Sequence, residues 1–259
     1  MPDAPIAVIF DIDGVIRDVA NSYRRALADT VEHFTQAYRP TPEDIDQLKA
    51  EGGWNNDWEA SQELIRRYGV AQAPDVLPPD LSFDTIKAFF QAKYRGENFN
   101  GYIQDEPLLV NLEFFQELTT SGMQWGFFSG ATRGSAEYIL TSRLGLISPC
   151  LIAMEDAPGK PNPSGLFQAL EQLNFPLQPN STVIYVGDTV VDMRTIQEAQ
   201  RKSVPGTWLA VGVIPPHVQD RQGYTEILLK AGAWHVLDRI LDLTPQLIDG
   251  LITKVHLRS

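Results

Sequence analysis

Short apolar runs that alternate with helix-like segments constrain the fold of this chain more than any other feature. The runs occupy residues 6–10, 124–128, 151–154, 182–186 and 207–211, and a shorter one lies at 234–237. Nearly unbroken apolar runs are typical of strands that are buried on both faces of a parallel sheet. Between them, apolar residues recur at steps of three and four, as at Leu112, Phe115 and Leu118. This alternation predicts an α/β fold with a Rossmann-like parallel sheet.

The expected strands are unevenly spaced along the chain. The first ends at Phe10 and the second begins only at Gln124, while helical patterns fill the interval. Helices are expected at 23–38, 41–49, 58–68 (ended by Gly69) and 83–94. Because a loop of this length is uncommon inside a compact domain, we predict an α/β core domain formed by residues 1–19 and 105–259. An α-helical cap domain would be inserted at residues 20–104.

Charge and composition exclude several classes of partner. The chain has 33 acidic and 21 basic residues, a net charge of −12, whereas nucleic acids and anionic membranes attract basic surfaces. No apolar stretch approaches the ~20 residues that cross a bilayer, and the first residues lack the basic and apolar regions of a signal peptide. The single cysteine, Cys150, favours a reducing compartment. We therefore expect a cytoplasmic monomer or homodimer with no nucleic-acid or membrane partner.

Polar and charged side chains follow the apolar runs. Asp11 and Asp13 come after the first run, Ser129 after the second, and Asp188 after the fourth, while Lys160 lies in the loop after the third. Ligands of open parallel sheets bind outside the carboxyl ends of the strands. The fold would therefore bring these residues together.

This set of residue types suits phosphoryl transfer. Neighbouring carboxylates repel one another unless a hard cation lies between them, and an all-oxygen ligand set favours Mg²⁺. One carboxylate can attack phosphorus to form an aspartyl-phosphate, and a second can protonate the leaving oxygen and then take a proton from water. A lysine and a hydroxyl can hold the phosphate oxygens. Each residue alone has a simpler interpretation: Lys160 as a surface lysine, and Ser129 as the cap of a strand end.

Two segments carry a resemblance to a known family. Together with Ser129 and Lys160, these segments resemble the four motifs of the haloacid dehalogenase (HAD) superfamily. The segments are Phe-Asp-Ile-Asp-Gly-Val-Ile at residues 10–16 and Gly-Asp-Thr-Val-Val-Asp at residues 187–192. The long insertion falls between the first and second motifs, as in the helical-cap subgroup that includes phosphoglycolate phosphatases and β-phosphoglucomutases. The second motif departs from the usual pattern, because Gly130 stands where members often have Asn.

The resemblance implies a catalytic role for several residues. Asp11 would be the nucleophile and Asp13 the general acid and base. Ser129, Gly130 and Lys160 would bind the phosphate group, with Ser129 and Lys160 also taking part in catalysis.

The resemblance also implies a metal site. Asp11, Asp188 and the backbone carbonyl of Asp13 would hold Mg²⁺, and Asp192 would support the metal shell.

Asp13 discriminates among the reactions of this superfamily. Dehalogenases and phosphonate-cleaving relatives usually lack this second aspartate, so its presence favours a phosphatase that hydrolyses a small phosphorylated metabolite. A phosphosugar mutase of the β-phosphoglucomutase type is the alternative. A non-catalytic protein that binds a phosphorylated ligand is a third hypothesis, which is disfavoured because no motif residue with a chemical role is missing.

Five residues are candidates for contact with the rest of the substrate: Arg17, Trp54, Asn55, Asn56 and Arg133. The tryptophan and the two asparagines could meet substrate hydroxyls, or the segment could simply begin the helix that follows. Arg17 and Arg133 could reach an anionic group of the substrate or pair with Asp18 and Glu137, and a structural role is favoured for Arg133.

Overall fold

The computed structural model describes residues 4–51, 54, 56–72 and 82–257. The chain divides into two compact units. The first, here called the α/β unit, comprises Met1–Asp18 and Pro107–Ser259, and the second, the helical unit, is the insertion Val19–Glu106. These boundaries differ by one residue and by two residues from those expected for the insertion at 20–104. Among the described residues, none of the helices has the length and apolar character needed to cross a bilayer.

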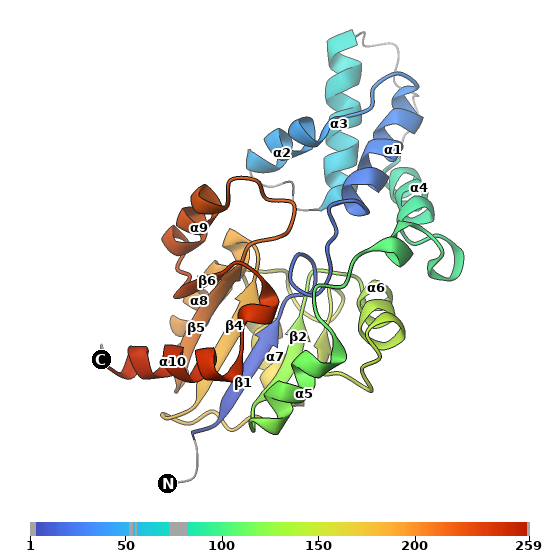
Figure 1. Ribbon diagram of the computed structural model, residues 1–259. Helices are drawn as coiled ribbons and strands as arrows, with labels where there is room; N and C mark the ends of the chain where they lie inside the picture. The colour runs from blue at the N-terminus through green and yellow to red at the C-terminus, as the bar shows by residue number, and fades with distance from the viewer. Residues whose placement is uncertain (1–3, 52–53, 55, 73–81, 258–259) are drawn as a thin grey trace. The chain divides into compact units, whose positions relative to one another are not determined.

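A six-stranded sheet forms the centre of the α/β unit, in the order β3–β2–β1–β4–β5–β6 (Figure 1). The strands are β1 (Ile6–Phe10), β2 (Gln124–Phe128), β3 (Leu151–Ile152), β4 (Thr182–Gly187), β5 (Thr207–Val213) and β6 (His235–Leu237). All of their pairings are parallel. The predicted α/β fold is confirmed, although β3 is shorter than its apolar run.

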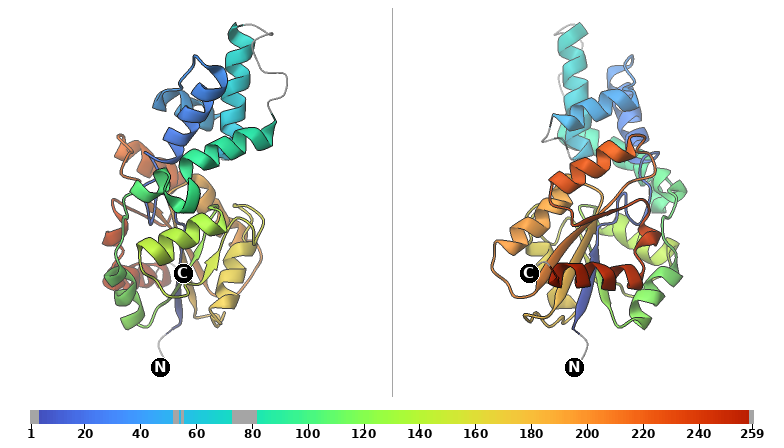
Figure 2. Two further views of the ribbon diagram at one scale, coloured as in Figure 1. Left: turned by 90° about the vertical axis from the view of Figure 1, so that its right-hand side faces the viewer. Right: turned by 60° about the vertical axis from the view of Figure 1, so that its left-hand side comes forward.

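Helices cover both faces of this sheet (Figures 1 and 2). They are α5 (Leu112–Thr120), α6 (Arg133–Glu137), α7 (Ser164–Gln172), α8 (Val190–Gln200), α9 (Arg221–Lys230) and α10 (Pro245–His256), with a π-helical segment at Tyr138–Arg143 and a 3₁₀ turn at Ile240–Asp242. Ala7 and Ile9 of β1 join the core formed with α7, α8 and α9. Phe10 points to the other face, where its ring packs edge-on against Phe114 and Phe115 of α5 at 5.8 and 5.7 Å between ring centroids. Because side chains of a strand alternate between faces, a strand covered on both sides must be apolar at every position.

The helical unit contains α1 (Tyr23–Thr35), α2 (Pro42–Ala50), α3 (Asp57–Gln72) and α4 (Phe83–Tyr94), followed by 3₁₀ turns at Glu97–Phe99 and Tyr102–Asp105. Thr41 and Asp44 form a capping box at the start of α2, and the ring of Tyr23 stacks on that of Tyr94 at 4.2 Å between centroids. Two helices end elsewhere than expected by three residues or more: α1 ends at Thr35 rather than at residue 38, and α3 continues past Gly69 to Gln72. A glycine lowers helix stability by about 1 kcal/mol, which tertiary packing can override.

Candidate active site

The candidate site lies at the carboxyl ends of the central strands. The chain moves from β1 outward through β2 to β3, then returns to place β4 on the other side of β1. Strand order therefore reverses beside β1, and the loops after β1 and β4 lie at the edge of the sheet where α/β proteins of this topology bind ligands. Asp11 directly follows β1, Ser129 directly follows β2, and Asp188 directly follows β4.

Asp11 is buried, and each of its two carboxylate oxygens has a partner in the protein. One oxygen, Oδ1, accepts a hydrogen bond from the backbone N–H of Ile12 at 2.7 Å. The other, Oδ2, lies 2.8 Å from Nζ of Lys160. Burial raises the pKa of Asp11 from 3.8 to about 6, and the positive charge of Lys160 opposes part of that rise. The side chain is thus fixed in orientation, with its charge only partly compensated.

Lys160 bridges Asp11 and a second carboxylate, Asp192. Its Nζ donates to Oδ1 of Asp192 at 2.6 Å. Burial lowers the pKa of Lys160, but the charges of Asp11 and Asp192 outweigh this effect and hold it well above its usual range. The ammonium group is therefore a permanent positive charge at the end of β1.

Asp192 is fully buried, and both of its oxygens have protein partners. Oδ1 accepts hydrogen bonds from Nζ of Lys160 and, at 3.3 Å, from the hydroxyl of Tyr185. Oδ2 accepts from the backbone N–H and the hydroxyl of Thr189, at 2.9 and 2.6 Å, in a capping box at the start of α8. Asp192 therefore anchors Lys160, and its expected support of a metal shell stays a prediction. The Thr189–Asp192 spacing is a capping-box signal that the sequence contains, whereas nothing in the sequence indicated Tyr185.

Asp13 is paired with an arginine that lies four residues further along. Nε and one terminal nitrogen of Arg17 lie 2.7 and 2.6 Å from Oδ1 of Asp13. The side chain of Arg17 is 0% exposed and that of Asp13 is 29% exposed. Sequence reasoning missed this pair, because the segment is a loop and the helical rule for residues four apart does not apply to it.

Ser129 and Gly130 form an open corner after β2. Ser129 is buried, its backbone N–H donates to the carbonyl of Ile152 at 3.0 Å, and its Oγ accepts from the N–H of Ala131 at 3.2 Å. Gly130 is exposed, and a Cβ built on it would meet no atom within 4 Å. The backbone N–H of Gly130 donates to none of the described residues. This corner could offer a hydroxyl and an amide to an anion.

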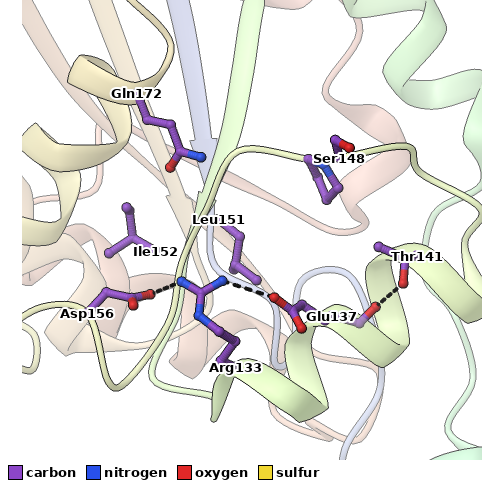
Figure 3. A pocket seen from close by; sticks show the side chains of 9 residues that line it. Arg133, Glu137, Thr141, Ser148, Leu151, Ile152, Asp156 and Gln172 are labelled. Atoms are coloured by element: carbon purple, nitrogen blue, oxygen red, sulfur yellow. Dashed lines mark hydrogen bonds and ion pairs between the residues drawn. The ribbon is translucent and has the colours of Figure 1, made fainter.

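Arg133 is held by carboxylates (Figure 3). It bonds to Glu137 at 3.0 Å, the pairing that the sequence suggested, and to Asp156, while its backbone N–H donates to Glu155 at 2.8 Å. Its side chain lines a surface cavity of about 400 Å³ beside β3. These contacts favour the structural role expected for Arg133.

In the helical unit, Asn56 accepts a hydrogen bond from the backbone N–H of Trp58 at 3.0 Å, next to the start of α3. This contact matches the alternative in which the segment begins a helix. Trp54 is half-buried. Asn55 lies outside the described residues.

Comparison with known proteins identifies the family. A family model of haloacid dehalogenase-like hydrolases matches residues 7–200, most of the chain. The chain belongs to this family. The solved structure of a phosphonoacetaldehyde hydrolase-like protein from Oleispira antarctica is similar, with a TM-score of 0.67 and 17% identity over 98% of this chain and 94% of that one. A β-phosphoglucomutase from Clostridium difficile has a TM-score of 0.64 and 17% identity, over 97% and 98% of the two chains.

A relative identified by sequence is longer than this chain. The imidazoleglycerol-phosphate dehydratase of Phytophthora nicotianae is 31% identical over 257 residues, which cover 92% of this chain and 52% of that protein. The chain thus spans about half the length of this relative. The structural likenesses, at these low identities, concern the fold.

A divalent cation fits the residues of this HAD-like hydrolase. Asp11, Asp188 and Asp192 each place a carboxylate oxygen within 4.8 Å of the others. The carboxylate of Asp188 accepts no hydrogen bond from the described residues, and burial together with the nearby aspartates raises its pKa well above the usual range. Such a carboxylate is stabilised by a cation with oxygen ligands. Asp11 and Asp188 would hold the ion, because both oxygens of Asp192 are already occupied.

Gly14 allows the first motif to approach Asp188 closely. Its φ of +74° lies in the left-handed region, and a Cβ at this position would fall 2.1 Å from Oδ2 of Asp188. Only glycine combines that backbone conformation with so short a contact. The glycine that follows Asp13 therefore sets the distance between the first and fourth motifs.

Proposed function

We propose that this hydrolase is a Mg²⁺-dependent phosphatase that acts on a small phosphorylated metabolite through an aspartyl-phosphate on Asp11. One observation carries the proposal: the buried Asp11 carboxylate contacts Lys160 at 2.8 Å and lies beside Asp188, a carboxylate without a hydrogen-bond partner among the described residues. The groups that would serve as nucleophile, phosphate-binding cation and metal ligand therefore lie together. Bound Mg²⁺ would supply positive charge that offsets the negative charge on the phosphate oxygens.

In the first half of the reaction, Lys160 and the Ser129–Gly130 corner hold the phosphate oxygens. A carboxylate oxygen of Asp11 forms a bond to phosphorus as the ester P–O bond breaks. Asp13, in its protonated form, gives its proton to the leaving oxygen, so that an alcohol departs and an aspartyl-phosphate remains.

In the second half, a water molecule attacks phosphorus and the bond between phosphorus and Asp11 breaks. Asp13, now ionised, takes the proton from that water. Inorganic phosphate leaves, and both aspartates return to their starting states. Lys160 keeps its charge throughout, since its ammonium group remains hydrogen-bonded to the carboxylate of Asp192.

The helical unit would act as the cap that selects the substrate. Support for this role comes from its place in the chain, between the first and second motifs. Because the name of the Phytophthora relative refers to a phosphorylated imidazole compound, a phosphate ester that carries an imidazole group belongs among the substrates tested. No dehydratase activity is proposed for this chain, which matches only about half of that protein.

A phosphosugar mutase is the second candidate. It is favoured by the structural likeness to β-phosphoglucomutase and by the same set of aspartates. A mutase would move the phosphoryl group between positions of a sugar phosphate after priming with a bisphosphate, and it would release little inorganic phosphate.

Release of inorganic phosphate from a panel of substrates tests the proposal. The panel contains 4-nitrophenyl phosphate, sugar phosphates, phosphoglycolate, nucleotides, phospho-amino acids and an imidazole-bearing alkyl phosphate, each assayed with Mg²⁺ and with EDTA. Asp11→Asn is compared with Asp238→Asn, which removes a carboxylate that is 73% exposed. We expect activity that requires Mg²⁺, is lost in Asp11→Asn and is retained in Asp238→Asn. Activity that survives both EDTA and Asp11→Asn would overturn the proposal.

A further inference from the structure

The loop after β1 closes on itself and brings Arg17 back to Asp13. The carbonyl of Ile12 accepts hydrogen bonds from the backbone N–H groups of Ile16 and Arg17, at 2.8 and 3.2 Å, and the N–H of Gly14 donates to the carbonyl of Arg17 at 2.9 Å. The backbone of Arg17 also forms an antiparallel bridge with that of Leu108. The backbone at both ends of the Asp13–Arg17 pair is therefore fixed by hydrogen bonds rather than by side-chain packing alone.

The guanidinium group engages only one of the two oxygens of Asp13. Its two contacts with Asp13, at 2.7 Å from Nε and 2.6 Å from a terminal nitrogen, both go to Oδ1. Within the part of the chain that the structure describes, Oδ2 accepts no hydrogen bond. A carboxylate held through one oxygen has a defined orientation and keeps the other oxygen available for a proton.

The ion pair with Asp13 is not explained by a gain in stability. Moving a guanidinium group out of water costs several kcal/mol, and an apolar side chain of similar volume is often as stable as a buried ion pair. Arg17 is nonetheless 0% exposed, and one of its partners is an aspartate of the candidate active site. Reacting groups need to be held within about 0.5 Å of their working geometry by neighbouring side chains.

We propose that Arg17 is a positioning residue for Asp13. It holds Oδ1 so that Oδ2 faces the leaving oxygen when the proton is transferred. This inference rests on the proposed phosphatase function, in which Asp13 is the general acid. Arg17 itself forms no bond to the substrate.

Dependence on the leaving group separates this role from a general structural one. A good leaving group such as 4-nitrophenolate departs without a proton, whereas the alkoxide of an alkyl phosphate needs one. The measured quantity is kcat/KM, which reports every step up to cleavage of the ester bond. For Arg17→Met we expect a loss of about 10²-fold on the alkyl phosphate, within the range for general acid catalysis. The loss on 4-nitrophenyl phosphate should be at least about ten times smaller.

Two further variants sharpen the test. Arg17→Lys keeps the positive charge but not the planar fork, so it should recover part of the loss on the alkyl phosphate. It also replaces Arg17→Met as the test variant if the latter does not fold. Arg221→Met is the control, since it removes an arginine that pairs with Asp238 on the surface of the same unit. It should leave kcat/KM unchanged on both substrates. Equal losses on both substrates in the Arg17 variants would overturn the proposal.

The double variant Arg17→Met/Asp13→Asn tests whether Arg17 acts through Asp13. Once Asp13→Asn has removed the acid, we expect the loss of Arg17 to add less than about twofold on the alkyl phosphate. A full additional loss of about 10²-fold would show that Arg17 acts independently of Asp13 and would contradict the proposal.

A crystal structure of Arg17→Met tests, independently of activity, whether Arg17 orients the Asp13 side chain. If the wild-type protein hydrolyses neither substrate, the proposed function fails, and the structure alone tests the positioning role. We expect the Asp13 carboxylate to adopt a different rotamer or several rotamers. An Asp13 side chain that keeps its single orientation without Arg17 would overturn the inference.

Discussion

A buried set of charged side chains in the α/β unit contrasts with an exposed set in the helical unit. In the α/β unit, Asp11, Lys160 and Asp192 are buried at the end of the central strands. In the helical unit, Arg67 bonds to Glu51 and Glu63 at 2.6 to 2.8 Å while its own side chain is 40% exposed. Exposed ion pairs contribute about 0–1 kcal/mol each, whereas buried charges cost free energy unless they are fully compensated. Stability therefore does not explain the buried set, which is the set to which the proposed function assigns the chemistry.

Among substitutions in the buried set, Asp11→Asn should have the largest effect. Asparagine keeps the shape of the side chain but cannot act as a nucleophile, so phosphate release should fall by a factor on the order of 10⁴ or more. Because burial of the Asp11 carboxylate is unfavourable, as its raised pKa of about 6 indicates, the melting temperature should not decrease. Phosphate assays and thermal unfolding of the same preparation measure both. A large loss of stability would mean that Asp11 is chiefly structural.

Removal of the metal should have the next largest effect. EDTA is expected to abolish activity, and added Mg²⁺ to restore it. In addition, Mg²⁺ should raise the melting temperature of the wild-type protein, because a ligand that binds only the folded state stabilises it. The shift should disappear in Asp188→Asn, which lacks the carboxylate that has no other partner among the described residues. An undiminished shift in that variant would place the ion elsewhere.

A methyl group at Gly14 should disturb the site through Asp188. In Gly14→Ala, the new Cβ would lie 2.1 Å from Oδ2 of Asp188, and the positive φ of +74° adds strain. We expect a marked loss of activity and a destabilisation of about 1–2 kcal/mol or more. Gly122→Ala is the matched control, because Gly122 has a φ of +77° with no atom within 4 Å of its Cβ position. If both variants lose activity equally, the contact with Asp188 is not the cause.

The smallest effect is expected in the helical unit, from Glu63→Gln. Hydrogen bonds from Arg66, together with those from Arg67, lower the pKa of Glu63 to about 2, below its value of about 4.3 in an unfolded chain. The contribution of the Glu63 charge to the free energy of unfolding should therefore be present above about pH 4.3 and disappear as the pH falls toward 2. Since solvent screens these pairs, it should not exceed about 1 kcal/mol.

Urea unfolding at neutral pH and at about pH 3 measures this contribution. The control is Glu226→Gln, since Glu226 is exposed and forms no ion pair with the described residues. A difference between wild type and Glu63→Gln that stays constant with pH would contradict the assignment.

The sequence predicted the sheet because a strand covered on both faces has to be apolar throughout, and such runs are visible in a single sequence. It also predicted that Asp11, Lys160 and Asp188 lie close together, since the ends of parallel strands share one edge. It could not predict that α3 passes Gly69, because tertiary packing overrides a local helix preference. The Arg17–Asp13 contact and the hydrogen bond of Tyr185 to Asp192 depend on loop closure and on packing between distant segments. These contacts are not encoded in any local spacing.

Chemical trapping of the phosphorylated enzyme tests the proposed aspartyl-phosphate on Asp11 itself. Wild-type protein is mixed with Mg²⁺ and the best substrate of the panel, quenched rapidly, and reduced with borohydride, which converts an aspartyl-phosphate to homoserine. Peptide mass spectrometry then locates the modified residue. We predict homoserine at position 11 in the wild type and none in Asp11→Asn. Phosphate release by a wild-type enzyme that never carries the modification at Asp11 would contradict this prediction.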